Sequence, residues 1–556
     1  MTNENTTKNQ ASPMTAVSAN GPTAFAAVVV IAVALFVACS AVMMPFQPDD
    51  AFVSFRYAEN LADGHGLTFN PGERPIEGYS NFLWILVCAA VYKIGFDLPT
   101  AMPWVGVFFG ALNLLALAGF YRRRRLSAAE VLIPLLLFAL AAPFVTHSIT
   151  GMETPLFSLL LLTAMIWVDA ANTGGRMISY LGLAVTGTLL ALCRPEGLIA
   201  FPVIVVARRF LPIGAIKEGS TTAGNSAGGR PLWAASGVFA VLVIAYHVWR
   251  ISYFGAVIPP SFAARFGGGG PVWQAWTDNF RMYFVTQGSD HLPSGYFTLL
   301  LAVGAVIGAS MSPARRDWKK TEQTALILAG VFSLIYFNFV DPMPGLRYHA
   351  PLIGLFFIPG VYLQNRVMKA LAVDKSLVGR LKVASLIVVA LALSFSWVAY
   401  LKMGMTRTET GNQDSAVALA DWLREALPRD ATLAINEAGI IPYYSDFRTV
   451  DIAPKPVVGD HPAGRWWDGW FFDTHSDVIV LTGRGIFYAT MAPEHYELVS
   501  SPRFNSIYRL LGVVRYDWFE DQSFWVYIPK DRPPFDDALL DKFPLGIGSV
   551  KRLYRR

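Results

Sequence analysis

Two adjacent carboxylates, Asp49 and Asp50, follow directly after the first long apolar run of the chain, which stops at residues 44–46. Apolar residues recur at helical spacing over residues 51–62, which predicts a short amphipathic helix at the membrane edge. Two carboxylates side by side at a low-dielectric edge raise each other's pKa, and a general base for work near neutral pH needs a raised pKa. We therefore take the acidic pair as the candidate chemical centre of the chain.

The acidic pair also has a simpler interpretation. Asp is a preferred N-cap, so one of the two could cap the helix that begins near Ala51. One Asp suffices for a cap, and the second carboxylate still needs another role. Both interpretations remain open at this point.

Polar and ionisable residues also gather at the outer ends of the predicted membrane helices and in the loop after the amphipathic helix. Ionisable groups are costly at membrane depth and face a cavity or one another, so we expect one polar cavity that opens outward. Arg194 and Glu196 also suit a simple ion pair that anchors a tight turn. Arg347 and His349 also suit interface positions with their tips in water. The full set is Asn70, Glu73, Arg74, Glu77, Tyr79, Asn81, Glu153, Arg194, Glu196, Arg250, Arg265, Arg347 and His349.

The composition is that of a polytopic α-helical membrane protein. Of 556 residues, 54% are hydrophobic and 15% are charged, whereas about a quarter are charged in soluble domains. The net charge of +5 is small and calls for no nucleic-acid partner, because topology explains the basic residues. Apolar stretches of roughly 17 to 25 residues predict about eleven transmembrane helices. They are 24–45, 100–120, 130–147, 155–172, 178–193, 196–211, 232–251, 293–311, 322–340, 349–364 and 382–403.

The distribution of Lys and Arg predicts the orientation of these helices. The stretch Phe82–Ile94 is too short to span. If it lies along the outer surface, the run Arg122–Arg125 falls inside, as the positive-inside rule prefers. Basic residues in the later inward loops agree. The acidic pair and the C-terminal region are therefore expected on the periplasmic face of the cytoplasmic (inner) membrane.

The three cysteines, Cys39, Cys88 and Cys193, lie far apart in apolar stretches. Small thiols in such stretches act as packing residues. We therefore expect no disulfide and no metal site built on Cys.

The chain divides by composition into three parts. Residues 1–23 are polar and predicted to be disordered in the cytoplasm. Residues 24–403 form the membrane domain, with residues 47–99 as its first periplasmic loop and juxtamembrane helices, and residues 404–556 form a soluble α/β domain. In this last part we expect a helix at Asp414–Leu427, strands at Ala431–Ile435, Thr449–Ile452 and Asp477–Leu481, a short helix opened by Asn436–Gly439, and a closing hairpin of Tyr508–Val513 with Ser523–Ile528.

These features suit an enzyme that works outside the cytoplasm on a sugar carried by a polyprenyl phosphate, since nucleotide sugars stay inside. The lipid tail needs an apolar groove, the phosphate needs cations such as Arg, and the acceptor hydroxyl needs a carboxylate base. A phosphate leaves readily, so no second carboxylic acid is required, in contrast to glycoside hydrolysis. No Gly-rich phosphate loop, HExxH motif or Ser nucleophile elbow competes with this interpretation.

Several stretches resemble one enzyme family. The first outer loop, with its acidic pair and the Asn70–Arg74 run, and the motif at Gly151–Phe157 resemble the GT-C fold of lipid-phosphosugar-dependent glycosyltransferases. Within that fold they are similar to the arabinofuranosyltransferase branch, which includes the mycobacterial cell-wall terminal β-(1→2)-arabinofuranosyltransferase and the pilin arabinofuranosyltransferases. RPEG at Arg194–Gly197 and MPGLRYHAP at Met343–Pro351 recur in related members. The resemblance covers the membrane domain well and the C-terminal domain weakly.

The resemblance implies a GT-C enzyme in which Asp49 is the catalytic base and Asp50 is the close second. It implies a polyprenyl-phosphate arabinofuranose donor and an inverting transfer to a glycan, such as cell-wall arabinan, or to a pilin. By hypothesis, Asp50 orients a substrate or binds a cation. The other assigned positions are Arg194, Arg347 and His349 for the donor phosphate, and Arg74, Glu77, Tyr79, Asn81 and Glu153 for the sugar or acceptor pocket.

Alternatives remain for the donor, the class of protein and the metal. A different GT-C transferase, for mannose or aminoarabinose, would share this chemistry. A lipid-linked sugar transporter would also have many spans, but it predicts inverted repeats and discontinuous helices at mid-bilayer, and no internal repeat is evident. A divalent cation at Asp49 and Asp50 is left open, because hard cations need several more oxygen ligands.

Overall fold

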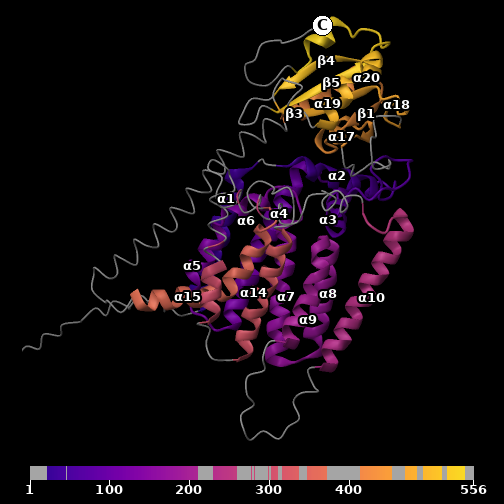
Figure 1. Cartoon of the computed structure of the whole chain (residues 1–556). Coiled ribbons are helices and arrows are strands. Elements are labelled where there is room, and N and C mark those ends of the chain that lie inside the picture. The colour runs from indigo at the N-terminus through magenta and orange to yellow at the C-terminus, as the bar shows by residue number, and fades with distance from the viewer. Residues whose placement is uncertain are drawn as a thin grey trace, which may run out of the picture.

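The computed structural model describes most of the chain as a helical part with a C-terminal sheet above it. In Figure 1 the sheet, in orange and yellow, lies over α2 and α3, and the long helices run downward beneath them. The predicted span 382–403, nearly half of 293–311, residues 1–21 and Arg265 lie outside the described residues. The described ranges are 22–44, 47–210, 229–259, 302–310, 316–336, 347–371, 414–453, 470–484, 493–515 and 522–544, with single residues at 277, 281 and 299.

Among the described residues, 4 helices are long and apolar enough to cross a membrane, or up to 5 if a bent pair counts as one span. The four are α1 (Pro22–Met43), α4 (Leu98–Arg123), α7 (Thr154–Gly174) and α10 (Gly229–Phe254). The predicted number of about eleven is therefore not confirmed; the span 382–403 lies wholly outside the described ranges, and 293–311 lies partly outside them.

Breaks in the helices account for part of this difference. The expected span 130–147 is bent by 57° between α5 (Ala128–Ala139) and α6 (Ala142–Ser148). Pro143 stands at this break, where it has no amide hydrogen to continue the α5 ladder. The expected span 196–211 starts as a 3-10 turn. The shorter or more polar elements are α8 (Met177–Cys193), η1 (Pro195–Ile199), α9 (Ala200–Phe210), α14 (Arg316–Tyr336), η3 (Ala350–Leu352) and α15 (Ile353–Leu371).

Two short helices lie between the long helices and the sheet. The predicted amphipathic helix is α2 (Asp49–Ala62), which buries its apolar face and packs on α3 (Phe82–Lys93). Gly64 and Gly66 follow α2 with φ of +89° and +83°, a region that glycine adopts at no steric cost. The amphipathic helix thus ends at Ala62, directly before these glycines.

The C-terminal α/β region, which we define as residues 414–544 where described, contains a 5-stranded sheet of order β2-β1-β3-β5-β4. β1 pairs in parallel with β2 and β3, and β5 pairs antiparallel with β3 and β4. The predicted strands and closing hairpin are confirmed, as is a helix over 414–426. The bounds are β1 (Thr432–Ile435), α17 (Ile440–Ser445), β2 (Arg448–Asp451), α18 (Trp470–Asp473), β3 (Val478–Arg484), α19 (Pro493–Ser500), α20 (Pro502–Ile507), β4 (Tyr508–Arg515), β5 (Gln522–Pro529) and α21 (Asp537–Asp541).

Other elements cover both faces of this sheet, so most side chains of its strands are apolar. Successive side chains of a strand point to opposite faces. Leu433 and Ile435 join the large core that also contains the helix over 414–426 and α2. Ala434 and Ile479 join a separate core with α18, α19 and α20. The face that carries Leu433 and Ile435 thus packs toward the helical part.

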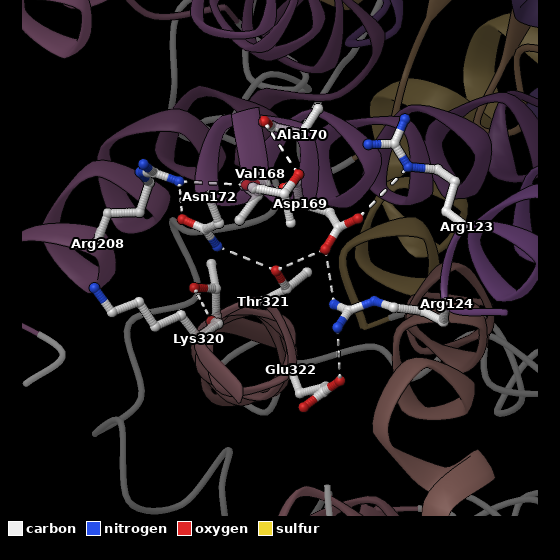
Figure 2. A network of polar contacts seen from close by, with 12 residues as sticks. Arg123, Arg124, Val168, Asp169, Ala170, Asn172, Arg208, Lys320, Thr321 and Glu322 are labelled. Carbon is white, nitrogen blue, oxygen red and sulfur yellow. Dashed lines mark hydrogen bonds and ion pairs between the residues drawn. The ribbon is translucent and has the colours of Figure 1, made fainter. Parts of the chain in front are cut away.

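A buried polar network ties α4, α7, α9 and α14 together at one end (Figure 2). Asp169 pairs with Arg124 at 2.8 Å, with Arg123 at 3.5 Å, and accepts a hydrogen bond from Thr321 at 3.4 Å. Arg124 lies 3.7 Å from Glu322. Asp169 follows Thr154 by fifteen residues, or about 22 Å of helix at 1.5 Å per residue. The Arg-rich ends of these helices therefore lie far from the start of α7.

We expect Arg124→Met to destabilise the protein, because Asp169 and Glu322 would remain buried without this cation. Breaking a buried ion pair from one side costs about 3–5 kcal/mol. Denaturant unfolding in detergent should show this loss. The exposed neighbour Arg122, changed to Met, serves as the control, and equal stability of the two variants would contradict the assigned role.

Candidate active site

The two carboxylates of the acidic pair occupy the first turn of α2 but have separate partners. The N-cap is Pro48, with no side-chain cap bond, so the capping role considered for Asp49 or Asp50 is wrong. Oδ1 of Asp49 accepts a hydrogen bond of 2.7 Å from the backbone amide of Ile440. Oδ2 of Asp50 pairs with Arg347 at 2.9 Å. Adjacent residues therefore have different electrostatic surroundings.

Asp49 has the properties of a general base. Burial raises the pKa of Asp49 to about 7, the amide of Ile440 lowers it, and the charge of Asp50 raises it. A base is most effective when its pKa lies near the working pH. The side chain of Asp50 is 43% exposed and already neutralised by Arg347. Of the two, Asp49 is the better proton acceptor.

Arg347 is buried, so the interface position considered for it is wrong, and the same holds for His349. One terminal nitrogen of Arg347 contacts Asp50, while its Nε has no hydrogen-bond partner among the described residues. The ring of His349 lies 5.5 Å from that of Tyr336. A buried guanidinium with an unused donor is suited to bind an anion.

A second polar group joins the loop after α2 to α7 and α8. Glu153 accepts a hydrogen bond of 3.0 Å from Asn81, and its other oxygen lies 3.7 Å from Arg194. Arg194 also pairs with Glu196 at 2.7 Å, which accepts a hydrogen bond from Tyr336 at 3.1 Å. The ion pair considered for Arg194 and Glu196 is confirmed. Arg194 is shared by two carboxylates and is thereby less available to a ligand than Arg347.

A cavity of about 500 Å³ adjoins this second group. Glu77, Tyr79, Glu196 and Arg250 line it with polar atoms, and Glu77 lies 3.4 Å from Nε of Arg250. Burial raises the pKa of Glu77 to about 7, against the charge of Arg250. Apolar side chains with a few placed polar groups are typical of a ligand site. The apolar lining includes Leu192, Leu198, Ile199, Val257, Ile258 and Ile335.

The structure arranges most of the predicted site residues in small groups and separates one. Arg74 is exposed and lies beside Gly255, outside the described lining of the cavity. Arg250 was predicted among the polar residues at the outer helix ends but not among the site residues, and it lines the cavity beside Glu77. Of the predicted residues, Glu77 and Tyr79 line the cavity, and Asn81, Glu153 and Arg194 form the polar group that adjoins it. Asp49, Asp50 and Arg347 form a group of their own outside the described lining, and His349 lies against Tyr336.

The C-terminal region holds α2 and its loop through Arg56, which nothing in the sequence indicated. The buried guanidinium donates to the carbonyl oxygens of Phe69 at 2.9 Å, Pro442 at 2.5 Å and Phe447 at 2.8 Å. Burial lowers the pKa of Arg56 to about 10. Asn70 adds a pair of hydrogen bonds to the backbone of Thr449, at 2.8 and 3.0 Å.

No group of three or more His, Cys, Asp or Glu side chains suited to a metal ion occurs in the part of the chain that the structure describes. A divalent cation at Asp49 and Asp50 stays a prediction. The three cysteines are buried and unpaired, as packing residues are.

Comparisons with known proteins show which known folds the chain is similar to. A model described as a domain of unknown function, DUF8728, matches residues 404–527. No curated protein matches the chain. The structure of ArnT from Cupriavidus metallidurans bound to undecaprenyl phosphate is similar, with 13% identity, a TM-score of 0.51, and coverage of 91% of this chain and 98% of that one. The apo form of that protein matches with 15% identity and a TM-score of 0.51, covering 90% and 98%.

A second similar protein is the oligosaccharyltransferase AglB from Archaeoglobus fulgidus, in complex with an inhibitory peptide and a dolichol-phosphate. It shares 12% identity with a TM-score of 0.52, over 82% of this chain and 69% of that one. At such identities the likeness concerns the fold. The chain has the GT-C fold shared by these membrane glycosyltransferases.

We expect Arg56→Lys to loosen the contact between α2 and the C-terminal region, because an ammonium cannot reach three carbonyl oxygens in a fixed fork. Hydrogen bonds from charged groups contribute about 1.5–3 kcal/mol each. Loss of one should speed amide exchange of the 440–451 segment about tenfold or more. The exposed Arg424, changed to Lys, is the control. Unchanged exchange in Arg56→Lys would contradict this role.

Proposed function

We propose that the chain is an inverting glycosyltransferase that moves arabinofuranose from a polyprenyl-phosphate donor to an acceptor hydroxyl. The observation that carries the proposal is the pair of unlike carboxylates: Asp49 with a pKa of about 7, beside Asp50 bound to the buried Arg347. Undecaprenyl phosphate and dolichol-phosphate in the similar structures support a lipid phosphate as the carrier.

In the proposed reaction, a carboxylate oxygen of Asp49 takes the proton from the acceptor hydroxyl. The acceptor oxygen forms a bond to the anomeric carbon while the bond from that carbon to the phosphate oxygen breaks. The electron pair leaves with the polyprenyl phosphate, and the configuration inverts. No general acid is needed, because the phosphate departs as a stable anion. One base and one cation therefore suffice for the step.

Arg347 is the proposed cation for the departing phosphate, because its Nε is an unused buried donor. Asp50 positions Arg347 through their ion pair. His349 follows it closely in the chain, and Arg194 adds charge from the neighbouring group. These roles assign electrostatic stabilisation of the leaving group to buried cations, whose effect is strongest where water is excluded.

The cavity beside Glu77 and Arg250 is the proposed place for the sugar and the first part of the lipid. Glu77 and Tyr79 line it with polar atoms, Asn81 and Glu153 belong to the adjoining polar group, and Arg74, outside the described lining, is assigned to this pocket from the sequence. The apolar lining suits a polyprenyl chain. The proposed acceptor is a glycan, such as arabinan, or a pilin.

The proposed setting follows the sequence. We place the active site and residues 404–556 on the periplasmic face of the cytoplasmic membrane, with residues 24–403 as the membrane domain. The basic ends of α4 and α9, near Arg124 and Arg208, lie at the far end of α7 from Glu153, as this orientation requires.

The donor sugar is tested by incubating the purified protein with polyprenyl phosphates that carry arabinofuranose, mannose or aminoarabinose. Mass spectrometry of the product from labelled donor identifies the transferred sugar. Transfer of mannose or aminoarabinose alone would replace arabinofuranose in the proposal. Donor carried across a vesicle membrane without transfer would indicate a transporter.

Asp49→Asn should lower the rate of transfer by about 10²- to 10⁴-fold, the usual contribution of a general base. The amide keeps an oxygen for the Ile440 hydrogen bond, so the fold should remain. The exposed Asp63 at the other end of α2, changed to Asn, is the matched control. Near-normal turnover of Asp49→Asn would assign the base to another residue.

Arg347→Ala should raise the KM for the donor, because a charge-assisted contact to phosphate would be lost. A loss of 1.5–3 kcal/mol corresponds to about a 10- to 150-fold change. Initial rates at varied donor concentration measure the change. The exposed Arg176, changed to Ala, should leave the KM unaltered, and an unchanged KM in Arg347→Ala would refute its role.

A further inference from the structure

The helical part and the C-terminal region approach each other closely at Asp49. The backbone amide of Ile440 donates to its carboxylate at 2.7 Å. A Cβ atom added at Gly439 would lie 2.1 Å from the carbonyl oxygen of Asp49 and 2.4 Å from both Cγ and Oδ2 of its side chain. Real Cβ atoms do not approach other atoms so closely. Glycine is therefore required for this contact.

The segment that carries Gly439 is fixed at both ends. On one side Asn436 accepts a hydrogen bond of 2.9 Å from the amide of Thr482 in β3, which anchors the segment to the sheet. On the other side α17 contacts α2: Tyr443 donates to Glu59, and the rings of Phe52 and Tyr443 lie 5.4 Å apart. The position of Gly439 against Asp49 is thus set by the sheet and by α2 together.

Further contacts surround this point and come from the same two segments. Arg56 binds the carbonyl oxygens of Pro442 and Phe447, Asn70 binds Thr449, and Arg448 pairs with Glu73 at 2.6 Å. Residues 49–73 and 439–449 therefore form a continuous interface. The C-terminal region could therefore not move away from Asp49 without breaking these contacts.

We propose that Gly439 and Ile440 are positioning residues for Asp49, so that the C-terminal region completes the active site. This inference rests on the proposed function. The two backbone amides hold the carboxylate in one orientation toward the acceptor. They also favour its charged form, since both lower the pKa that burial raises. Both residues lie in the region 404–527 that matches DUF8728, so the proposal assigns this region a role in the active site.

The test compares Gly439→Ala with Gly512→Ala. At Gly512 an added Cβ meets the ring of Phe543 at 2.7 Å, inside the C-terminal region and away from Asp49. Both variants crowd the same region, but only the first displaces the amides from Asp49. Transfer is measured from pH 5.5 to 9 with saturating and with limiting donor.

Because Asp49 acts as a base, the rate of the unmodified protein should rise with pH through a pKa of about 7. In Gly439→Ala the rise should move to higher pH by about one unit, which lowers kcat at pH 6 about tenfold. The KM for the donor should stay the same, and high pH should restore much of the rate. Gly512→Ala should keep the original profile. An unshifted profile in Gly439→Ala, or equal shifts in both variants, would overturn the proposal.

A second measurement needs no substrate. Amide exchange of residues 47–58 should become faster in Gly439→Ala and remain unchanged in Gly512→Ala. Equal exchange in the two variants would overturn the positioning role even if transfer is lost. Absence of transfer by the unmodified protein would contradict the proposed function, and the exchange measurement would still decide whether Gly439 holds Asp49.

Discussion

The burial of one guanidinium, that of Arg56, sets the arrangement on which the site depends. A buried cation is tolerated only when hydrogen bonds replace its water. Arg56 obtains them from Phe69 in the loop after α2 and from Pro442 and Phe447 in the C-terminal region. These carbonyl oxygens belong to segments almost 400 residues apart, so the satisfied charge fixes α2, its loop and the sheet in one geometry. The contact of Gly439 with Asp49 follows from this geometry.

Within this frame, two neighbouring carboxylates acquire different properties. Asp50 lies against a cation, whereas Asp49 lies against backbone amides and is largely removed from water. A pair of identical side chains can then divide two tasks, since one holds a cation and the other accepts a proton. The division depends on a partner, Arg347, that lies 297 positions away in the sequence.

The sequence predicted those features that local rules determine. Helical periodicity and two glycines defined α2, apolar length separated α3 from a full span, and alternating strands flanked the β4–β5 hairpin. Contacts between residues far apart in the sequence could not be predicted. The spacing of residues along the chain does not show which carboxylate pairs with Arg250 or which backbone amide binds Asp49. The predicted number of spans is not confirmed over the described residues, and apolar length alone does not detect the bend before Pro143 or the 3-10 turn at Pro195.

The ion cluster around Asp169 has a mechanical consequence. It joins α4, α7 and α14 by buried charges whose separation carries a desolvation cost. The other end of α14 borders the cavity at Ile335, and the adjacent Tyr336 donates a hydrogen bond to Glu196. Buried polar contacts therefore hold α14 at both of its described ends.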